Sequence, residues 1–286
     1  MILHRRSLIA SSAALAFSGL ARNVHAAEEE TYLNEVVGYG PLKRDPNGVL
    51  DLPEGFSYRI VSQGGETMAD GLLVPGQFDG MGCFALDDSR VALVRNHELK
   101  GSSASHRNWG PGGYNQERIG RLDANRAYDT YKDGRPLPGG TTTVIYDLAT
   151  GRTERQHLSL AGTNCCGGQT PWGSWLSCEE TSELPADSDV TKDHGYVFEV
   201  PARAEGLVDP VPLKAMGRFE HEAVCVDPRT GILYLTEDQG DGLFYRFLPD
   251  APGELAKGGR LQAMVLRGHN GADTSNHKDR IWSVGD

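Results

Sequence analysis

GCFALDDSRVALVRNHE, residues 82–98, decides the fold class of this 286-residue chain. An apolar run leads into Asp87 and Asp88, and a second apolar run follows them and ends at an acid, Glu98. Two short apolar runs on either side of such turn residues are typical of an antiparallel β-hairpin. The stretch therefore predicts a hairpin whose second strand ends at a carboxylate.

The same unit recurs along the chain. AVCVDPRTGILYLTED at 223–238 repeats the strand, the turn and the acidic end, and GLFYRFLP at 242–249 adds a third strand. TTTVIYDLATGRTERQHLSL at 141–160 gives another hairpin, and GSWLSCEE at 173–180 also ends in acids. Small antiparallel sheets repeated radially form a β-propeller. We expect an all-β fold, a β-propeller, with a β-sandwich of the same hairpins as the alternative.

Residues 1–26 have the pattern of an export signal. Arg5 and Arg6 precede an apolar stretch that is short for a membrane span, and small residues stand before Ala27. The paired arginines favour the twin-arginine route, which exports folded proteins to the periplasm or beyond. We therefore expect a twin-arginine signal peptide at 1–26, a β-propeller domain at 27–286, and no membrane anchor after the signal is removed.

The mature chain is strongly acidic. The formal charge is −11 and becomes −14 without the leader, which contains three arginines and no acids. Such a chain repels the backbone of nucleic acids, whereas clustered carboxylates attract hard cations. The charge therefore argues against a nucleic-acid partner and favours a cation site.

The acids at the ends of the expected strands are the first candidate ligands. Strand ends from separate blades of a propeller converge around its central channel, so acids far apart in the sequence can share one site. Crowded carboxylates repel one another unless a cation joins them. Ca²⁺ or Mg²⁺ suits such a set, and a thiolate within it calls for a transition metal. The candidates are Glu98, Glu179 or Glu180, Glu222 and Asp238.

The cysteines supply the candidate thiolate. Cys83 and Cys225 lie in apolar strand-like runs, where we expect small buried thiols. A glycine-flanked loop lets the backbone at Cys165 approach a metal closely, whereas strand alternation places Cys178 on the same face as Glu180. The metal thiolate is therefore Cys165 or Cys178, unless these two cysteines form a disulfide in an oxidising compartment.

Two histidines precede candidate acids. His97 stands in NHE and His221 in HEA, each one residue before a glutamate. Neighbouring residues of a strand point to opposite faces, so these rings face away from the acids. We expect both to be core or hydrogen-bonded supporting residues rather than ligands.

Three segments of the chain resemble the PhoX-type alkaline phosphatases. They are NHE at 96–98, TNCCGGQTPWGSWLSCEE at 163–180 and GRFEHEAVCVDPRTGILYLTED at 217–238, and the resemblance covers most of residues 80–250. It implies a secreted β-propeller with an iron and calcium centre that hydrolyses phosphate esters. It also implies that Cys165 is the iron thiolate, that Glu179 or Glu180 binds metal, and that Glu222 is a further ligand.

The expected function is metal-dependent hydrolysis of small phosphate esters. Two alternatives stay open: a calcium-dependent lactonase or esterase, which needs no thiolate, and a non-catalytic secreted propeller that binds metal and a partner. The resemblance further implies a C-terminal portion with another metal carboxylate that this sequence does not contain. We therefore expect a propeller truncated at its C-terminus, with weak or no activity by itself.

Overall fold

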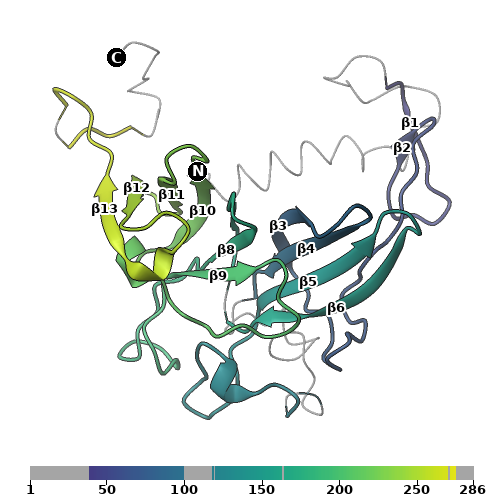
Figure 1. Cartoon of the computed structure of the whole chain (residues 1–286), viewed down its shortest axis with the longest axis horizontal. Coiled ribbons are helices and arrows are strands. Elements are labelled where there is room, and N and C mark those ends of the chain that lie inside the picture. Colours follow the sequence, from purple (N-terminus) through teal and green to yellow (C-terminus); the bar gives the residue numbers. More distant parts are fainter. Residues whose placement is uncertain (1–38, 100–117, 119, 163, 270, 275–286) are drawn as a thin grey trace, which may run out of the picture. The chain divides into compact units, whose positions relative to one another are not determined.

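The computed structural model describes residues 39–99, 118, 120–162, 164–269 and 271–274, and Figure 1 shows their path. The expected signal peptide at 1–26 lies outside these residues. The described chain is all-β, as the hairpin pattern predicts, and it divides after Ile60 into two compact units. None of the helical segments within the described ranges has the length and apolar character that crossing a membrane requires.

The first unit contains a small two-stranded sheet. Its strands are β1 (Leu42–Lys43) and β2 (Leu52–Pro53), which pair antiparallel. Asp45 fixes the turn between them, because its carboxylate accepts hydrogen bonds from the Asn47 N–H at 3.0 Å and the Tyr58 hydroxyl at 2.6 Å. These bonds hold the pKa of Asp45 well below its usual range.

The second unit contains three larger sheets. Each joins strands in the order in which they follow in the chain, and every neighbouring pair is antiparallel. The first sheet is β3 (Phe78–Ala85), β4 (Arg90–His97), β5 (Gly140–Asp147) and β6 (Arg152–Leu160). The second is β7 (Gly167–Gln169), β8 (Ser174–Cys178) and β9 (Val197–Pro201). The third is β10 (His221–Val226), β11 (Leu233–Glu237), β12 (Phe244–Pro249) and β13 (Gly259–Ala263).

Consecutive antiparallel strands of this kind are the strand order of a propeller blade, so the fold is compatible with the expected propeller. Three short 3₁₀ helices lie between strands of the described chain: η4 (Ala124–Arg126), η5 (Lys214–Met216) and η6 (Leu255–Lys257).

Aspartates fix the hairpin turns of these sheets. Asp87 accepts a hydrogen bond from the N–H of Arg90 at 2.8 Å, and Asp147 and Asp227 accept bonds from the N–H two or three residues later in their own turns. An aspartate that bonds the following backbone in this way stabilises a tight turn. The turn residues identified in the sequence therefore close the hairpins as expected.

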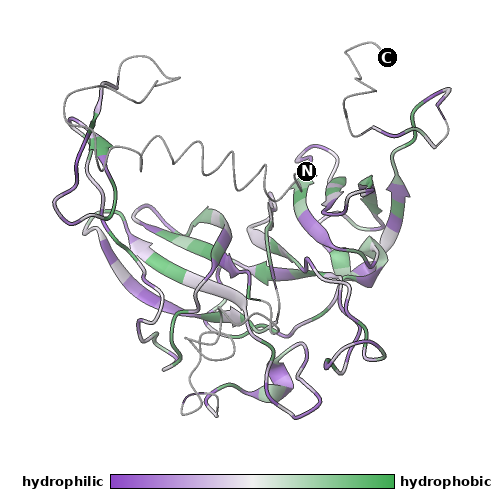
Figure 2. Cartoon of the chain, turned by 180° about the vertical axis from the view of Figure 1, so that it is seen from behind, coloured by the Kyte–Doolittle hydropathy of each residue, from purple (hydrophilic) through white to green (hydrophobic). Residues whose placement is uncertain are grey.

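The second sheet is covered on both faces. All residues of β8 are buried, and its apolar side chains belong to two different hydrophobic clusters. Trp175 packs with residues of the first sheet, such as Val94, whereas Leu176 packs with residues of the third, such as Leu235. Figure 2 shows hydrophobic residues interspersed with polar ones along the strands. The strand therefore has no exposed side, and its two serines make hydrogen bonds inside the protein.

The prediction that Cys83 and Cys225 are buried is wrong. Both thiols are exposed, and the residues next to them in the strand, Phe84 and Val224, are buried instead. Because side chains alternate across a strand, an apolar run does not say which of its residues face the core. The bulky neighbours take the buried positions, and the cysteines face solvent.

The first strand of the second sheet contacts the first strands of the other two sheets. β7 touches both β3 and β10. A Cβ atom on Gly168 would lie 1.8 Å from the carbonyl oxygen of Val224, and one on Gly80 would lie 2.8 Å from Sγ of Cys166. Glycine therefore permits a backbone approach that no other residue allows. This approach brings the starts of three strands from three sheets together.

Candidate metal centre

Acids and a thiol gather where the first strand of each sheet begins and the second strand ends. Because these strands are antiparallel, Phe78 pairs with His97 in the first sheet and His221 pairs with Glu237 in the third. The residue after each of these pairs is acidic. The acids and the thiol at these strand ends are Asp79, Glu98, Cys165, Glu180, Glu222 and Asp238.

Asp79 and Glu222 occupy equivalent positions in two sheets. Each is the second residue of its strand. The pairing register shifts between Phe78 and Met81 in the first sheet, and between His221 and Val224 in the third. A bulge of this kind bends the strand and re-aims a side chain. In both the first and the third sheet, a bulge thus directs a carboxylate.

Five of these side chains form two overlapping groups that could hold a metal ion. Cys165 belongs to both: one group adds Asp79 and Glu98, and the other adds Glu180 and Glu222. Within each group the candidate ligand atoms lie within 4.8 Å of one another. The thiol of Cys165 lies 3.0 Å from a carboxylate oxygen of Asp79 and 3.9 Å from both oxygens of Glu222. The thiol therefore stands where the two groups meet.

The burial of the groups is uneven. Cys165 and Glu180 are 3% and 6% exposed, whereas Asp79, Glu98 and Glu222 are more accessible to solvent. Burial raises the pKa of the Cys165 thiol well above its ordinary value, and the negative charges of Asp79 and Glu222 raise it further. A bound cation reverses this effect, because a coordinating thiol loses its proton.

The donor set fits a mixed metal centre. Carboxylate oxygens are the ligands that Ca²⁺ prefers, and a thiolate selects a softer transition metal. The chain offers both kinds of donor within a few ångströms, with the thiol between the carboxylates. The residues present therefore suit a centre that combines a hard cation with a softer transition metal.

Asn96 ties the first sheet to the strands that carry the thiol. Its side-chain oxygen accepts hydrogen bonds from Thr141, Trp175 and Ser177 at 2.8, 3.1 and 2.8 Å, and its amide donates to the carbonyl of Cys166 at 2.7 Å. Asn96 is fully buried. A buried amide satisfied in this way holds its partners in one arrangement, so Asn96 fixes the chain next to Cys165.

The two glutamates of the CEE motif have different surroundings. Glu180 joins the group of Cys165 and Glu222, but Glu179 points its carboxylate at another loop. That carboxylate accepts hydrogen bonds from the N–H groups of Gly195 at 2.9 Å and Tyr196 at 3.1 Å, and it contacts a histidine. The geometry therefore favours Glu180 over Glu179 as a ligand.

Asp238 and Cys178 stand outside both groups of described side chains. Asp238 follows β11, and its N–H donates to the carbonyl of Glu220 at 3.0 Å. Cys178 is fully buried in the hydrophobic cluster between the second and third sheets. Cys165 and Cys178 are free thiols, so the alternative of a disulfide between them is not formed in this structure.

The two histidines are core residues, as expected. His97 and His221 are fully buried. The ring of His97 makes hydrogen bonds with the carbonyl of Gly76 at 2.9 Å and the hydroxyl of Thr142 at 2.8 Å. Burial lowers the pKa of His97 to about 3 and that of His221 to about 4, so both rings are neutral.

The sequence reasoning missed Asp79. The expected hairpin began at Gly82, whereas β3 begins four residues earlier, at Phe78. A signal was present: Asp79 precedes its hairpin as Glu222 precedes the hairpin of the third sheet. Asp79 is the second residue of β3, as Glu222 is the second residue of β10.

An all-β chain with a thiol and four carboxylates gathered where first strands begin and second strands end is a candidate metalloprotein. A family model described as alkaline phosphatase PhoX matches residues 37–282, which is most of the chain. The chain therefore belongs to the PhoX alkaline phosphatase family, as its three characteristic segments suggest. Neither the curated proteins nor the solved structures include a match to it.

Proposed function

We propose that this protein is a metal-dependent phosphatase that hydrolyses small phosphate esters. The convergence of Cys165 with carboxylates from three sheets carries the proposal, since it supplies soft and hard donors at one place. Membership of the PhoX family supports the same class of reaction. We propose iron and calcium as the metals, with the iron bound by the thiolate of Cys165.

Each group of ligands has its own part in this proposal. Asp79 and Glu98 flank the thiol on one side, and Glu180 and Glu222 flank it on the other. Metals held there neutralise the negative charge of a phosphate ester and polarise its phosphorus–oxygen bonds. Since the mature chain is acidic, its carboxylates repel an anionic substrate until cations compensate them.

The residues of the chain also set access to the centre. Glu180 and Cys165 are buried, so they lie on the closed side of the site. Glu98 and Glu222 are partly exposed, and they lie on the side from which a substrate can approach. An ester that enters on this side would approach Glu98 and Glu222 before the more deeply buried Cys165.

We also propose that the protein reaches the periplasm through the twin-arginine route. Arg5 and Arg6 in the leader carry this proposal, which concerns residues outside the described structure. Replacement of both by lysine should leave the precursor in the cytoplasm. A mature, exported product from the double-lysine variant would contradict the proposed route.

Purification of the mature protein tests the proposed function. We expect elemental analysis to find iron and calcium, and we expect weak but measurable release of phosphate from a phosphomonoester. Glu180→Gln and Glu222→Gln should each lower turnover about tenfold or more, because each removes a charge that holds metal. Glu154→Gln is the matched control, since Glu154 forms only an exposed ion pair with Arg90. Turnover within about twofold of the parent in both site variants would contradict the assignment.

A further inference from the structure

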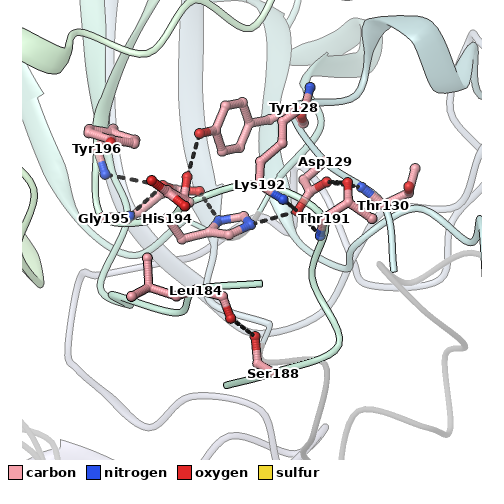
Figure 3. A network of polar contacts seen from close by, with 12 residues as sticks. Tyr128, Asp129, Thr130, Leu184, Ser188, Thr191, Lys192, His194, Gly195 and Tyr196 are labelled. Atoms are coloured by element: carbon pink, nitrogen blue, oxygen red, sulfur yellow. Dashed lines mark hydrogen bonds and ion pairs between the residues drawn. The ribbon is translucent and has the colours of Figure 1, made fainter. Parts of the chain in front are cut away.

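A buried polar network lies beside the candidate centre (Figure 3). His194 stands between two carboxylates, with Nε2 3.1 Å from an oxygen of Asp129 and Nδ1 2.7 Å from an oxygen of Glu179. All three side chains are at least nine-tenths buried. Buried charged groups persist only when they are paired and hydrogen-bonded, so each member of this network depends on the others.

Asp129 anchors one side of the network. Its carboxylate accepts hydrogen bonds from the N–H groups of Thr130 at 2.7 Å and of Thr191 and Lys192 at 2.9 Å, and also from the hydroxyl of Thr191. These bonds hold the start of the loop at 191–196, which leads into β9. Figure 3 shows His194 directed from this loop toward Asp129.

Glu179 anchors the other side. One oxygen of its carboxylate receives the N–H groups of Gly195 and Tyr196, and the other oxygen faces His194. Burial lowers the pKa of His194, but the bonds to Glu179 and Asp129 outweigh this and raise it above its ordinary value. The charge of Glu179 is therefore compensated inside the network.

The main chain of Glu179 connects this network to the candidate ligands. Its N–H donates to the carbonyl of Tyr196 at 3.0 Å, and its carbonyl accepts from the N–H of His221 at 3.0 Å. The next residue after Glu179 is Glu180, and the next after His221 is Glu222. Both belong to the same metal-binding group. The peptide of Glu179 thus joins the two segments that present these carboxylates.

We propose that Glu179 and His194 are positioning residues that set the metal affinity of the group formed by Cys165, Glu180 and Glu222. Glu179 does not bind the metal. It holds the main chain that aims Glu180 and Glu222, and His194 holds Glu179. This inference rests on the proposed metal centre and assigns to the CEE motif two separate tasks, support and ligation.

Calcium titration of the metal-free full-length mature protein by calorimetry tests the proposal. His194→Ala and Glu179→Ala should each weaken Ca²⁺ binding about tenfold or more, as the loss of a residue that orients a ligand does. Glu179→Gln should stay within about threefold of the parent, because its amide oxygen still accepts the two backbone N–H groups. Glu180→Gln, which removes a ligand charge, should lose as much affinity as Glu180→Ala.

His157→Ala is the matched control. His157 is also fully buried and hydrogen-bonded, to the carbonyl of Ala204 at 3.1 Å, but it lies in β6 and outside the network. We expect this variant to lose stability and to keep its Ca²⁺ affinity. Thermal unfolding of every variant shows whether it is folded at the temperature of the titration.

Three other outcomes of these titrations would each contradict a specific part of the proposal. Equal losses of affinity in Glu179→Gln and Glu179→Ala would make Glu179 a ligand and refute its positioning role. A parent that binds metal, together with unchanged affinity in Glu179→Ala and His194→Ala, would refute the inference alone. A parent that takes up neither calcium nor iron would refute the proposed function and this inference with it.

Discussion

At the scale of the residue, Cys165 differs from every other cysteine in its surroundings. It alone among the five lies in the groups of candidate ligands, and its thiol donates to Asp79. We expect Cys165→Ser to lose most of its transition metal, since a hydroxyl is a poor ligand for a soft metal. Calcium should be lost less, because the carboxylates stay in place. Elemental analysis of the purified variant measures both.

The control for this substitution is Cys83→Ser. Cys83 is exposed on β3 and belongs to neither ligand group, so its replacement should leave the content of both metals unchanged. Equal loss of iron in the two variants would show that the thiol of Cys165 is not the ligand.

Sequence reasoning at this scale found acids at the ends of second strands and overlooked an acid near the start of a first strand. Glu98 and Glu180 follow runs of apolar residues, and such runs are visible in a sequence. Asp79 lies within a bulge, which obscures the period-two pattern that marks a strand. The choice between Glu179 and Glu180 depends on bonds to a loop at 194–196, and no local pattern encodes these.

At the scale of the element, the glycines of β7 allow this strand to approach β10. A methyl group on Gly168 would meet the carbonyl oxygen of Val224 at 1.8 Å, so Gly168→Ala must push the two strands apart. We expect a loss of about 2–3 kcal/mol in the free energy of unfolding, the usual cost of overpacking. Ca²⁺ affinity should fall as well, because Cys165 lies just before β7 and Glu222 is the second residue of β10.

Gly206→Ala is the control for the alanine substitution. A Cβ atom at Gly206 meets nothing within 4 Å, and we expect its free energy of unfolding to change by less than about 0.5 kcal/mol. Urea unfolding measures the free energy of unfolding of both variants. A similar free energy of unfolding for the two would mean that β7 can move away from β10 without penalty.

The outer strand of the first sheet carries a pH-sensitive histidine. Burial lowers the pKa of His157, whose ring is 1% exposed. Below about pH 6.5 the unfolded chain binds a proton at this residue and the folded chain resists it, so stability falls as the pH falls. We expect His157→Gln to reduce this loss between pH 7.5 and 5.5, by at most about 1.4 kcal/mol per pH unit.

Urea unfolding of the parent and of His157→Gln at both pH values checks this expectation. The difference between the two proteins isolates His157, since the other buried histidines are common to both. A variant that loses as much stability on acidification as the parent would show that His157 takes up its proton equally well in the folded state.

The hairpins themselves follow from the sequence. The expected strand, turn and strand at 82–98, 141–160 and 223–238 correspond to β3–β4, β5–β6 and β10–β11. Turn aspartates and apolar runs are local signals, so they need no knowledge of the rest of the chain. The contacts between first strands are long-range, and only the glycines at 80 and 168 hint at them.

At the scale of the whole molecule, metal binding should stabilise the fold, because the ligands come from three sheets. At a free Ca²⁺ concentration one hundred times its dissociation constant, binding contributes about 2.7 kcal/mol. For a domain of this size that corresponds to a rise of about 5–10 °C in the unfolding midpoint. Calorimetric scans with excess chelator and with excess Ca²⁺ measure the difference.

Glu180→Gln provides the comparison for this shift. A variant that binds Ca²⁺ weakly should unfold at nearly the same temperature in chelator and in calcium. If the parent also unfolds at one temperature in both solutions, then Ca²⁺ does not link the sheets.

The contact between Cys165 and the carboxylates has a consequence for how the protein is made. Asp79 precedes Cys165 by 86 residues, and Glu222 follows it by 57. A ribosome must therefore reach the start of the third sheet before all five side chains can meet, and contacts between residues so far apart in the sequence form slowly. For the proposed metal centre, complete loading would thus be a late event in biogenesis. A newly made chain with its full complement of metal would already have brought its three sheets together, which would make metal content a mark of maturity.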